Sequence, residues 1–282
     1  MISQVAVIGG GTMGNGIAHV LARQGLAVIL AEIDQGALER ARATIEKNLG
    51  REVSKGKLSA AAAAAALARI AITTTLPEAA AADLVIEAVP ERRELKTELF
   101  RRLDALAPPA TIFASNTSSL SITELAAVTR RPDRCIGMHF MNPVPLMPLV
   151  EVIRGIATSD ATCTAVRELA LRLDKEPVEV ADYPGFVSNR VLMPMINEAI
   201  FCVMEGVADA AAVDAVMKLG MNHPMGPLAL ADFIGLDVCL DIMEVLHRGF
   251  SDSKYRPCPL LRRMVAAGWL GKKSGRGFFQ YS

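Results

Sequence analysis

The segment VAVIGGGTMGNGIAHVLARQG, residues 5–25, constrains the fold more than any other part of the chain. An apolar run leads directly into a glycine-rich turn, and helical spacing of apolar residues follows. Gly9, Gly11 and Gly14 have GxGxxG spacing: the first allows a tight turn, the second lets a ligand approach the backbone, and the third lets the helix pack on the sheet. The first N–H groups of such a helix bind phosphate oxygens. We therefore expect a strand–turn–helix unit that binds a dinucleotide.

Short apolar runs recur through the first two-thirds of the chain. Helical patterns separate these runs, which cover residues 4–8, 27–31, 68–74, 83–89 and 111–115. Runs that are apolar throughout are typical of parallel strands with helices on both faces. Repeated strand–helix–strand units build a doubly wound sheet. The fold class is therefore α/β, with an N-terminal Rossmann-like domain over residues 1–183.

The pattern changes after residue 182. The DYPG stretch punctuates the chain, and the apolar residues beyond it follow helical spacing without a strand candidate. We expect an all-α C-terminal domain over residues 184–282. Its apolar content is high for its size, which indicates that part of its surface contacts a partner subunit.

Glu32 stands at the end of the second apolar run, where dinucleotide-binding folds carry an acid. A carboxylate there accepts hydrogen bonds from the ribose hydroxyls and repels a 2′-phosphate, which favours NAD over NADP. Asp34 is placed to cap the next helix. His19, within the first helix, has no acid beside it and is assigned to packing alone.

Two polar clusters follow later strands, at the sheet edge where such folds bind ligands. Glu91 and Lys96 come after the fourth strand, and Asn116 and Ser118 come after the fifth. The tetrapeptide at 121–124 has the spacing of a capping box. Because a capping box does not require the preceding SNTSS, we assign Asn116 and Ser118 to ligand binding.

The segment IGMHFMNPVPLMPLVEVI, residues 136–153, carries the candidate chemistry. His139 ends a sixth strand, and Glu151 interrupts the apolar run of the strand that faces it. A buried carboxylate requires a partner, and His139 is the near candidate. A Glu–His pair suits a general base that takes the proton of an alcohol while the hydride goes to nicotinamide. The alternative is a core histidine and a glutamate turned to solvent.

Seven segments resemble the L-3-hydroxyacyl-CoA dehydrogenase family, in order and over essentially the whole chain. They are GGGTMGNGIA, VIEAVPE, ASNTSSLSIT, GMHFMNPVPLMPLVEVI, GFVSNR, HPMGPLALADFIGLD and GWLGKKSGRGF. The resemblance is closest to the short bacterial 3-hydroxybutyryl-CoA dehydrogenases. It implies NAD-dependent interconversion of a (3S)-3-hydroxyacyl-CoA, short-chain in this case, and its 3-ketoacyl-CoA.

The resemblance also implies roles for individual residues. His139 is the implied catalytic base, Glu151 orients it, and Ser118 and Asn189 hold the reacting oxygen or the thioester carbonyl. Closure of the second domain would bring Asn189 toward the site. The cofactor-binding set then comprises Gly9, Gly11, Thr12, Met13, Gly14, Glu32, Glu91, Lys96, Asn116, Ser118 and Asn142.

A basic group on the helical excursion after the second strand matches the family's coenzyme A site. It consists of Arg51, Lys55 and Lys57, and a solvated helix face is the alternative interpretation. The family commonly has aspartate where this chain has Glu32, which leaves the strictness of NAD over NADP open. Two other functions compete: a dehydrogenase of free 3-hydroxy acids or sugar acids, and a non-enzymatic NAD-binding protein like the crystallin relatives of this fold.

Composition excludes several classes of protein. Lys+Arg and Asp+Glu balance at 30 each, so no global field attracts nucleic acid or an anionic membrane. The five cysteines form no CxxC pair and mostly lie in apolar segments, so we expect neither disulfides nor metal ligation. The sequence shows no secretory signal and no apolar run of about 18 residues, the length of a membrane span. We expect a cytoplasmic acyl-CoA enzyme, and the resemblance implies a homodimer formed through the helical domain.

Overall fold

The structure, a computed structural model, describes residues 2–281. The chain divides into two compact units, Met1–Asp182 and Tyr183–Ser282. The division falls one residue before the boundary expected from the sequence.

An eight-stranded sheet forms the centre of the first unit, in the order β3-β2-β1-β4-β5-β6-β7-β8. Its strands are β1 (Gln4–Ile8), β2 (Ala27–Ala31), β3 (Ile70–Thr73), β4 (Leu84–Glu87), β5 (Ile112–Ser115), β6 (Cys135–Phe140), β7 (Leu149–Arg154) and β8 (Glu176–Ala181). Neighbouring strands are parallel except for β6 and β7, which are antiparallel. The five parallel strands before β6 all end at the same edge, which collects the polar clusters that follow them.

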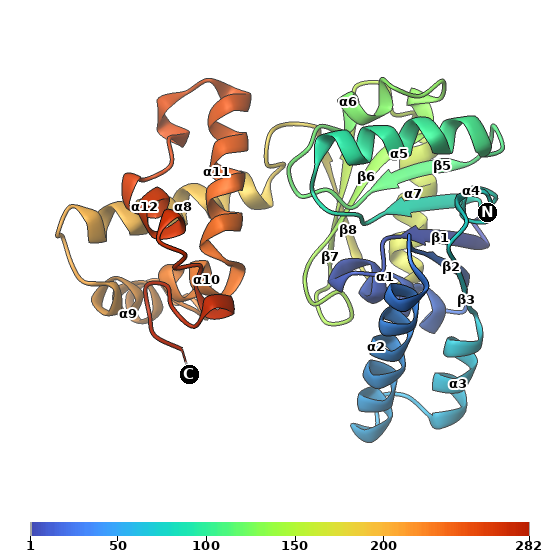
Figure 1. Cartoon of the computed structure of the whole chain (residues 1–282), viewed down its shortest axis with the longest axis horizontal. Coiled ribbons are helices and arrows are strands. Elements are labelled where there is room, and N and C mark those ends of the chain that lie inside the picture. Colours follow the sequence, from blue (N-terminus) through green and yellow to red (C-terminus); the bar gives the residue numbers. More distant parts are fainter. Residues whose placement is uncertain (1, 282) are drawn as a thin grey trace. The chain divides into compact units, whose positions relative to one another are not determined.

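Helices cover both faces of this sheet (Figure 1). They are α1 (Thr12–Arg23), α2 (Gln35–Ser54), α3 (Ala60–Ala68), α4 (Leu76–Ala80), α5 (Arg93–Leu106), α6 (Ile122–Ala126), the 3₁₀ turn η1 (Pro132–Arg134) and α7 (Asp160–Arg172). One apolar cluster joins α1, α2, α3 and α7 to one face, and a second joins α4, α5 and α6 to the other. Alternate strand residues enter the two clusters: Val5 and Val7 pack in the first, Ala6 and Ile8 in the second. The predicted doubly wound α/β domain is confirmed.

Two helices, α2 and α3, lie between β2 and β3, as the sequence predicted. Asp34 caps α2 by accepting a hydrogen bond from Ala37 N at 3.2 Å. The chain breaks between α2 and α3 around Gly56, which has a φ of +68°. The alanine tract after Ser59 forms α3, as expected from the high helix propensity of alanine. Figure 1 shows α2 and α3 side by side.

Strand β8 was missed. Its sequence, EPVEVA, carries two glutamates three positions apart, contains Pro177, and lies mostly exposed. It pairs only with β7 and forms the edge of the sheet, where a proline costs no ladder hydrogen bond. Nothing in so short and polar a segment distinguishes it from a loop.

The second unit is helical throughout its described part, residues 183–281. Its elements are α8 (Ser188–Met204), α9 (Ala210–Gly220), α10 (Pro227–Ile234), α11 (Leu236–Phe250), η2 (Ser253–Tyr255), α12 (Pro259–Ala266) and η3 (Lys272–Ser274). They enclose an apolar core of their own, which includes Ile200, Leu228 and Leu246. The predicted all-α C-terminal domain is confirmed.

Candidate active site

The glycine turn between β1 and α1 has the geometry that its spacing predicts. Gly9 has a φ of +104°, and a Cβ there would lie 2.5 Å from the Ala88 carbonyl oxygen. A Cβ on Gly14 would lie 1.6 Å from the Gly9 oxygen, so only glycine allows this close packing. A Cβ on Gly11 would meet nothing within 4 Å, and no side chain caps the helix that begins at Thr12. The turn therefore leaves the N-terminus of α1 open to a phosphate group.

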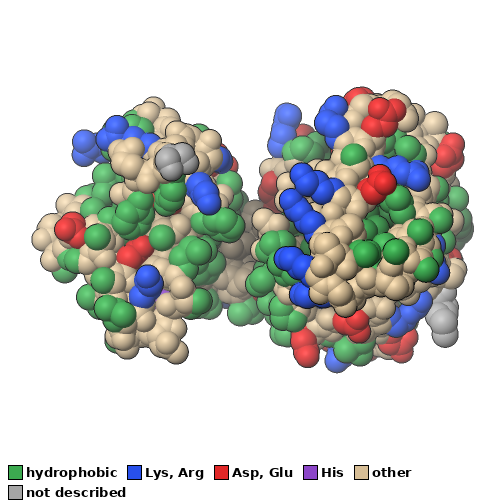
Figure 2. Space-filling model, turned by 90° about the horizontal axis from the view of Figure 1, so that it is seen from below, with side chains coloured by type: hydrophobic (Ala, Val, Ile, Leu, Met, Phe, Trp, Pro, Cys, Tyr) green, Lys and Arg blue, Asp and Glu red, His purple; other side chains and the backbone are tan. Residues whose placement is uncertain are grey.

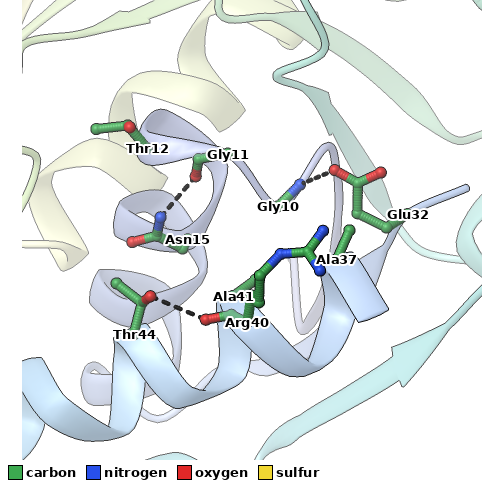
Figure 3. Close-up of a pocket in the computed structure, with 9 residues that line it drawn as sticks. All are labelled: Gly10, Gly11, Thr12, Asn15, Glu32, Ala37, Arg40, Ala41 and Thr44. Carbon is green, nitrogen blue, oxygen red and sulfur yellow. Dashed lines mark hydrogen bonds between the residues drawn. The ribbon is translucent and has the colours of Figure 1, made fainter. Parts of the chain in front are cut away.

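Glu32 lies beside this turn, in a cavity of about 250 Å³ (Figure 3). Its Oε1 accepts a hydrogen bond from Gly10 N at 2.7 Å, and its Oε2 accepts one from Ile33 N at 3.0 Å. Figure 3 shows the Arg40 side chain rising from α2 across the cavity. The cavity is lined by Gly10, Gly11, Thr12, Asn15, Glu32, Ala37, Arg40, Ala41 and Thr44. A carboxylate held at the turn fits the ribose of a dinucleotide.

Asn142 lies near the same turn although it follows β6. With Thr12, Asn15 and Asn48 it lines a second cavity, of about 180 Å³. Met13, the other predicted residue of this region, packs partly buried against the first apolar cluster. The glycine turn, α2 and the segment after β6 thus enclose one polar region.

Glu91 and Lys96 meet after β4. The Lys96 Nζ lies 3.1 Å from Glu91 Oε2, and its side chain is only 1% exposed. Glu91 Oε1 accepts hydrogen bonds from Ser118 N at 2.9 Å and Ser119 N at 3.1 Å. Burial alone would raise the pKa of Glu91, but the charge of Lys96 and these hydrogen bonds hold that pKa below its usual value. The two predicted clusters therefore form one network.

Asn116 connects this network to β6. Its Oδ1 accepts a hydrogen bond from Phe140 N at 2.9 Å, and the side chain is buried. The amide thus fixes the residue that follows His139 against the end of β5.

His139 and Glu151 stand directly opposite each other in the antiparallel pair of β6 and β7. The His139 Nδ1 lies 2.7 Å from Glu151 Oε2, and the two residues are 6% and 2% exposed. On the other side of the ring, Nε2 lies 3.1 Å from Ser118 Oγ. An ionised carboxylate only accepts hydrogen bonds, so the Nδ1 hydrogen of the ring faces Glu151. The structure thus brings together Ser118, His139 and Glu151, three residues that the sequence singled out.

The remaining predicted residues lie elsewhere in the two units. Asn189, in the first turn of α8, is buried in the second unit. Arg51, Lys55 and Lys57 are exposed at the end of α2 and just beyond it. Figure 2 views the molecule from the side on which α2 ends and α3 begins, and shows Lys and Arg side chains on the first unit there.

The interpretation of His19 as having no acid beside it is wrong. Its Nε2 lies 3.2 Å from Glu52 Oε1, which α2 contributes. The contact does not have the geometry of a hydrogen bond, and neither ring nitrogen has another partner among the described residues. Burial lowers the pKa of His19, against the opposing effect of Glu52. The acid lies 33 residues away in sequence, on another helix, so no local pattern could reveal it.

Two kinds of feature do not occur in the described residues. Between residues 2 and 281, no three His, Cys, Asp or Glu side chains form a group that could hold a metal ion. No described helix has both the length and the apolar character needed to cross a membrane.

Family models match nearly the whole chain. The NAD-binding domain of 3-hydroxyacyl-CoA dehydrogenase matches residues 4–183, and the C-terminal domain of the same family matches residues 185–281. The chain belongs to the 3-hydroxyacyl-CoA dehydrogenase family. As a member of this family it is an NAD-dependent oxidoreductase, and its first unit is the NAD-binding domain. The resemblance, the enzyme class and the cofactor inferred from the sequence are confirmed.

Individual relatives of the family align over their full length. A probable 3-hydroxybutyryl-CoA dehydrogenase of Bacillus subtilis (strain 168) is 61% identical over 280 residues, which is 99% of this chain and 98% of the relative. The 3-hydroxybutyryl-CoA dehydrogenase of Bradyrhizobium diazoefficiens is 56% identical, over 100% of this chain and 96% of the relative. A crystal structure of (S)-3-hydroxybutyryl-CoA dehydrogenase from Ralstonia eutropha superposes with a TM-score of 0.98, at 52% identity and with full coverage of both chains.

One buried acid of the site region was missed. Glu87, the last residue of β4, is fully buried and contacts Lys96 Nζ at 2.7 Å. The signal that identified Glu151, an acid inside an apolar run, also marks Glu87 in DLVIEAV.

Proposed function

We propose that this chain interconverts (3S)-3-hydroxybutyryl-CoA and acetoacetyl-CoA, with NAD as the cofactor. The names of the relatives support the substrate, and one observation supports the mechanism. That observation is the buried pair of His139 and Glu151, in which Nδ1 lies 2.7 Å from Oε2. Ser118 Oγ lies at the other ring nitrogen, Nε2.

His139 acts as the general base in this proposal. Its Nε2 lone pair takes the proton of the 3-hydroxyl group, and the reverse reaction returns the proton to the ketone oxygen. Glu151 holds the imidazole in the required tautomer and stabilises the positive charge that forms on the ring. Ser118 and Asn189 bind the reacting oxygen or the thioester carbonyl.

The glycine turn holds the cofactor. The α1 N-terminus binds its pyrophosphate beside Gly11, and Glu32 binds the adenosine ribose. Bound NAD supplies the hydride acceptor. Among the other predicted cofactor residues, Thr12, Met13 and Asn142 lie around the same turn.

Substrate recognition is proposed for the basic group at the end of α2. Arg51, Lys55 and Lys57 bind the anionic phosphoadenosine part of coenzyme A. Their exposure and positive charge support this role, because phosphate oxygens are strong acceptors for such donors. The proposal also includes a cytoplasmic location and a homodimer formed through the helical unit.

A direct assay tests the activity. Purified protein should consume NADH when acetoacetyl-CoA is added, and the loss of NADH absorbance measures the rate. Free acetoacetate at the same concentration is the control, and it should react far more slowly. Equal rates on the free acid would contradict the acyl-CoA substrate, while no rate on either would contradict the function. Short-, medium- and long-chain 3-ketoacyl-CoA then define the acyl preference.

A further inference from the structure

Glu87 is a buried acid for which the proposed mechanism has no use. Its carboxylate is fully buried at the end of β4. Ser115 Oγ donates to its Oε2 at 2.6 Å, and Val89 N donates to its Oε1 at 2.7 Å. Lys96 Nζ also donates to Oε1, at 2.7 Å. A carboxylate in such a place requires these partners, because removing one from water is costly.

Three oxygen atoms surround the ammonium group of Lys96. An ammonium group has three N–H donors. Those of Lys96 have three acceptors within reach: Glu87 Oε1 at 2.7 Å, Glu91 Oε2 at 3.1 Å and Val89 O at 3.3 Å. The contact with Glu91 is an ion pair, and the side chain is only 1% exposed. These contacts support a role for Lys96 inside the protein beside its predicted role as a cofactor contact.

Glu91 connects Lys96 to the turn that carries Ser118. While Oε2 faces Lys96, Oε1 accepts from Thr117 Oγ1, from Ser118 N and from Ser119 N. Ser118 Oγ then lies 3.1 Å from the nitrogen of His139 that the mechanism uses. A continuous chain of contacts thus runs from β4 to the candidate base.

We propose that Glu87 and Lys96 are positioning residues, which hold Ser118 against His139 through Glu91. This inference rests on the proposed function of Ser118 and His139. Two carboxylates share one ammonium group, so Glu87 determines where Lys96 sits, and Lys96 determines which way Glu91 turns. Neutralising Glu87 lets Lys96 move toward Glu91 and shifts the turn, and a displacement of about 1 Å in such a group costs about 100-fold in rate.

Hydrogen–deuterium exchange tests the positioning without using activity. In Glu87→Gln, the peptide that spans 115–120 should take up deuterium faster than in the parent protein, while the peptide that spans β1 should be unchanged. Asp104→Asn is the matched control, because Asp104 is also a buried carboxylate in an ion pair, with Arg131. It should leave the exchange of 115–120 unchanged.

Kinetics test whether Glu87 acts through Ser118. Glu87→Gln should lower kcat about 100-fold with little change in the Kd of NAD. In a Ser118→Ala background the same substitution should cost little more, because the group that it displaces is already absent. Asp104→Asn should keep the parent kcat. If Glu87→Gln alone does not fold, Glu87→Gln with Lys96→Met removes both charges together, and the same exchange and kinetic results are expected.

The outcomes separate this inference from the proposed function. Unchanged exchange at 115–120, or a kcat loss that is equally large with and without Ser118, would overturn the positioning role. A parent protein without activity on acetoacetyl-CoA would overturn the function and still leave the exchange result to decide the position of the turn.

Discussion

Two histidine–acid pairs show how the same residue types differ in use. His139 has Glu151 at one ring nitrogen and Ser118 at the other, each within hydrogen-bond distance. His19 lies 3.2 Å from Glu52 but has no hydrogen bond to either nitrogen among the described residues. The first arrangement holds the ring between two polar partners. The second leaves a histidine for which the charged form is unfavourable.

The first prediction concerns His139. Replacing it by Gln keeps a polar side chain of similar size but removes the group that exchanges the proton. We expect His139→Gln to lower kcat by about 10²–10⁴-fold, with the Kd of NAD unchanged. NADH consumption and NAD titration measure the two quantities. His247→Gln, near the end of α11, is the control and should keep the parent rate. A His139→Gln protein with near-parent kcat would remove this histidine from the mechanism.

The second prediction concerns His19. Burial lowers its pKa from the ordinary 6.5, so below about pH 6.5 the unfolded chain binds a proton that the folded chain does not. The unfolding free energy therefore decreases as the pH falls through the window between 6.5 and the lower pKa of the folded state. We expect His19→Gln to make the unfolding free energy less dependent on pH in this window. Urea denaturation of both proteins at several pH values measures it, and identical slopes would contradict the prediction.

Sequence reasoning succeeded where a signal was local or lay on two consecutive strands. Gly9, Gly11 and Gly14 identified their own turn because each requirement is set within a few residues. His139 and Glu151 could be paired because consecutive strands face each other. Glu52 could not be predicted, since its distance from His19 depends on how α1 packs on α2. The hydrogen bond from Ser118 N to Glu91, 27 residues away, depends in the same way on how β4 and β5 pair.

The register of β6 and β7 decides the candidate site at the scale of elements. The antiparallel pairing puts His139 opposite Glu151, and a slip of one residue would turn the acid to the other face of the sheet. Side chains after β4 and β5 then complete the site from the neighbouring parallel strands. Since the strands were predicted but their register was not, the sequence indicated these residues without their distances.

The third prediction concerns the start of α6. Asp182 accepts hydrogen bonds from Ser121 Oγ at 2.7 Å, Ile122 N at 3.1 Å and Thr123 N at 2.7 Å. Asp182→Ala leaves these donors without that acceptor, so we expect the unfolding free energy to fall by about 1–3 kcal/mol. Urea denaturation measures it. The control is Asp160→Ala, an exposed aspartate paired with Arg154, which should cost about 0–1 kcal/mol. Equal effects of the two substitutions would show that the hydrogen bonds to Asp182 at the start of α6 do not stabilise the unit.

The fourth prediction concerns the end of α2. Reversing two charges, with Arg51→Glu and Lys55→Glu together, should raise the KM for acetoacetyl-CoA about tenfold or more, because a charge-assisted hydrogen bond contributes about 1.5–3 kcal/mol. The kcat and the rate on free acetoacetate should hardly change. Arg101→Glu with Arg102→Glu, exposed on α5, is the matched control. An unchanged KM would indicate that Arg51 and Lys55 lie on a solvated helix face and do not bind the substrate.

At the scale of the whole molecule, each unit has its own apolar core, and the charges of the chain balance. Electrostatic attraction between whole chains therefore gives no reason for two copies to associate, and an exposed apolar surface is the alternative cause. Figure 2 shows hydrophobic side chains spread over one side of the helical unit. On and beside α9, the exposed fractions are 70% for Val207, 62% for Val216, 87% for Leu219 and 61% for Met221.

The fifth prediction uses this surface to test the proposed homodimer. Val216 and Leu219 are three residues apart on α9, so their side chains share a face of the helix. A carboxylate placed there is fully solvated in a monomer but loses its water in a dimer that uses this face. Leu219→Glu should therefore weaken the dimer about 100-fold or more, while the thermal stability of the monomer changes little.

Sedimentation equilibrium over a range of protein concentrations measures the association. Leu171→Glu is the matched control, because Leu171 is also exposed, at 60%, but lies on α7 of the first unit. The parent and the control should sediment as dimers at concentrations at which Leu219→Glu sediments as a monomer. If Leu219→Glu stays dimeric, the subunits meet on another face. If the parent is itself monomeric, the exposed leucine and valine of α9 need a different explanation, since water alone gives no reason to keep them there.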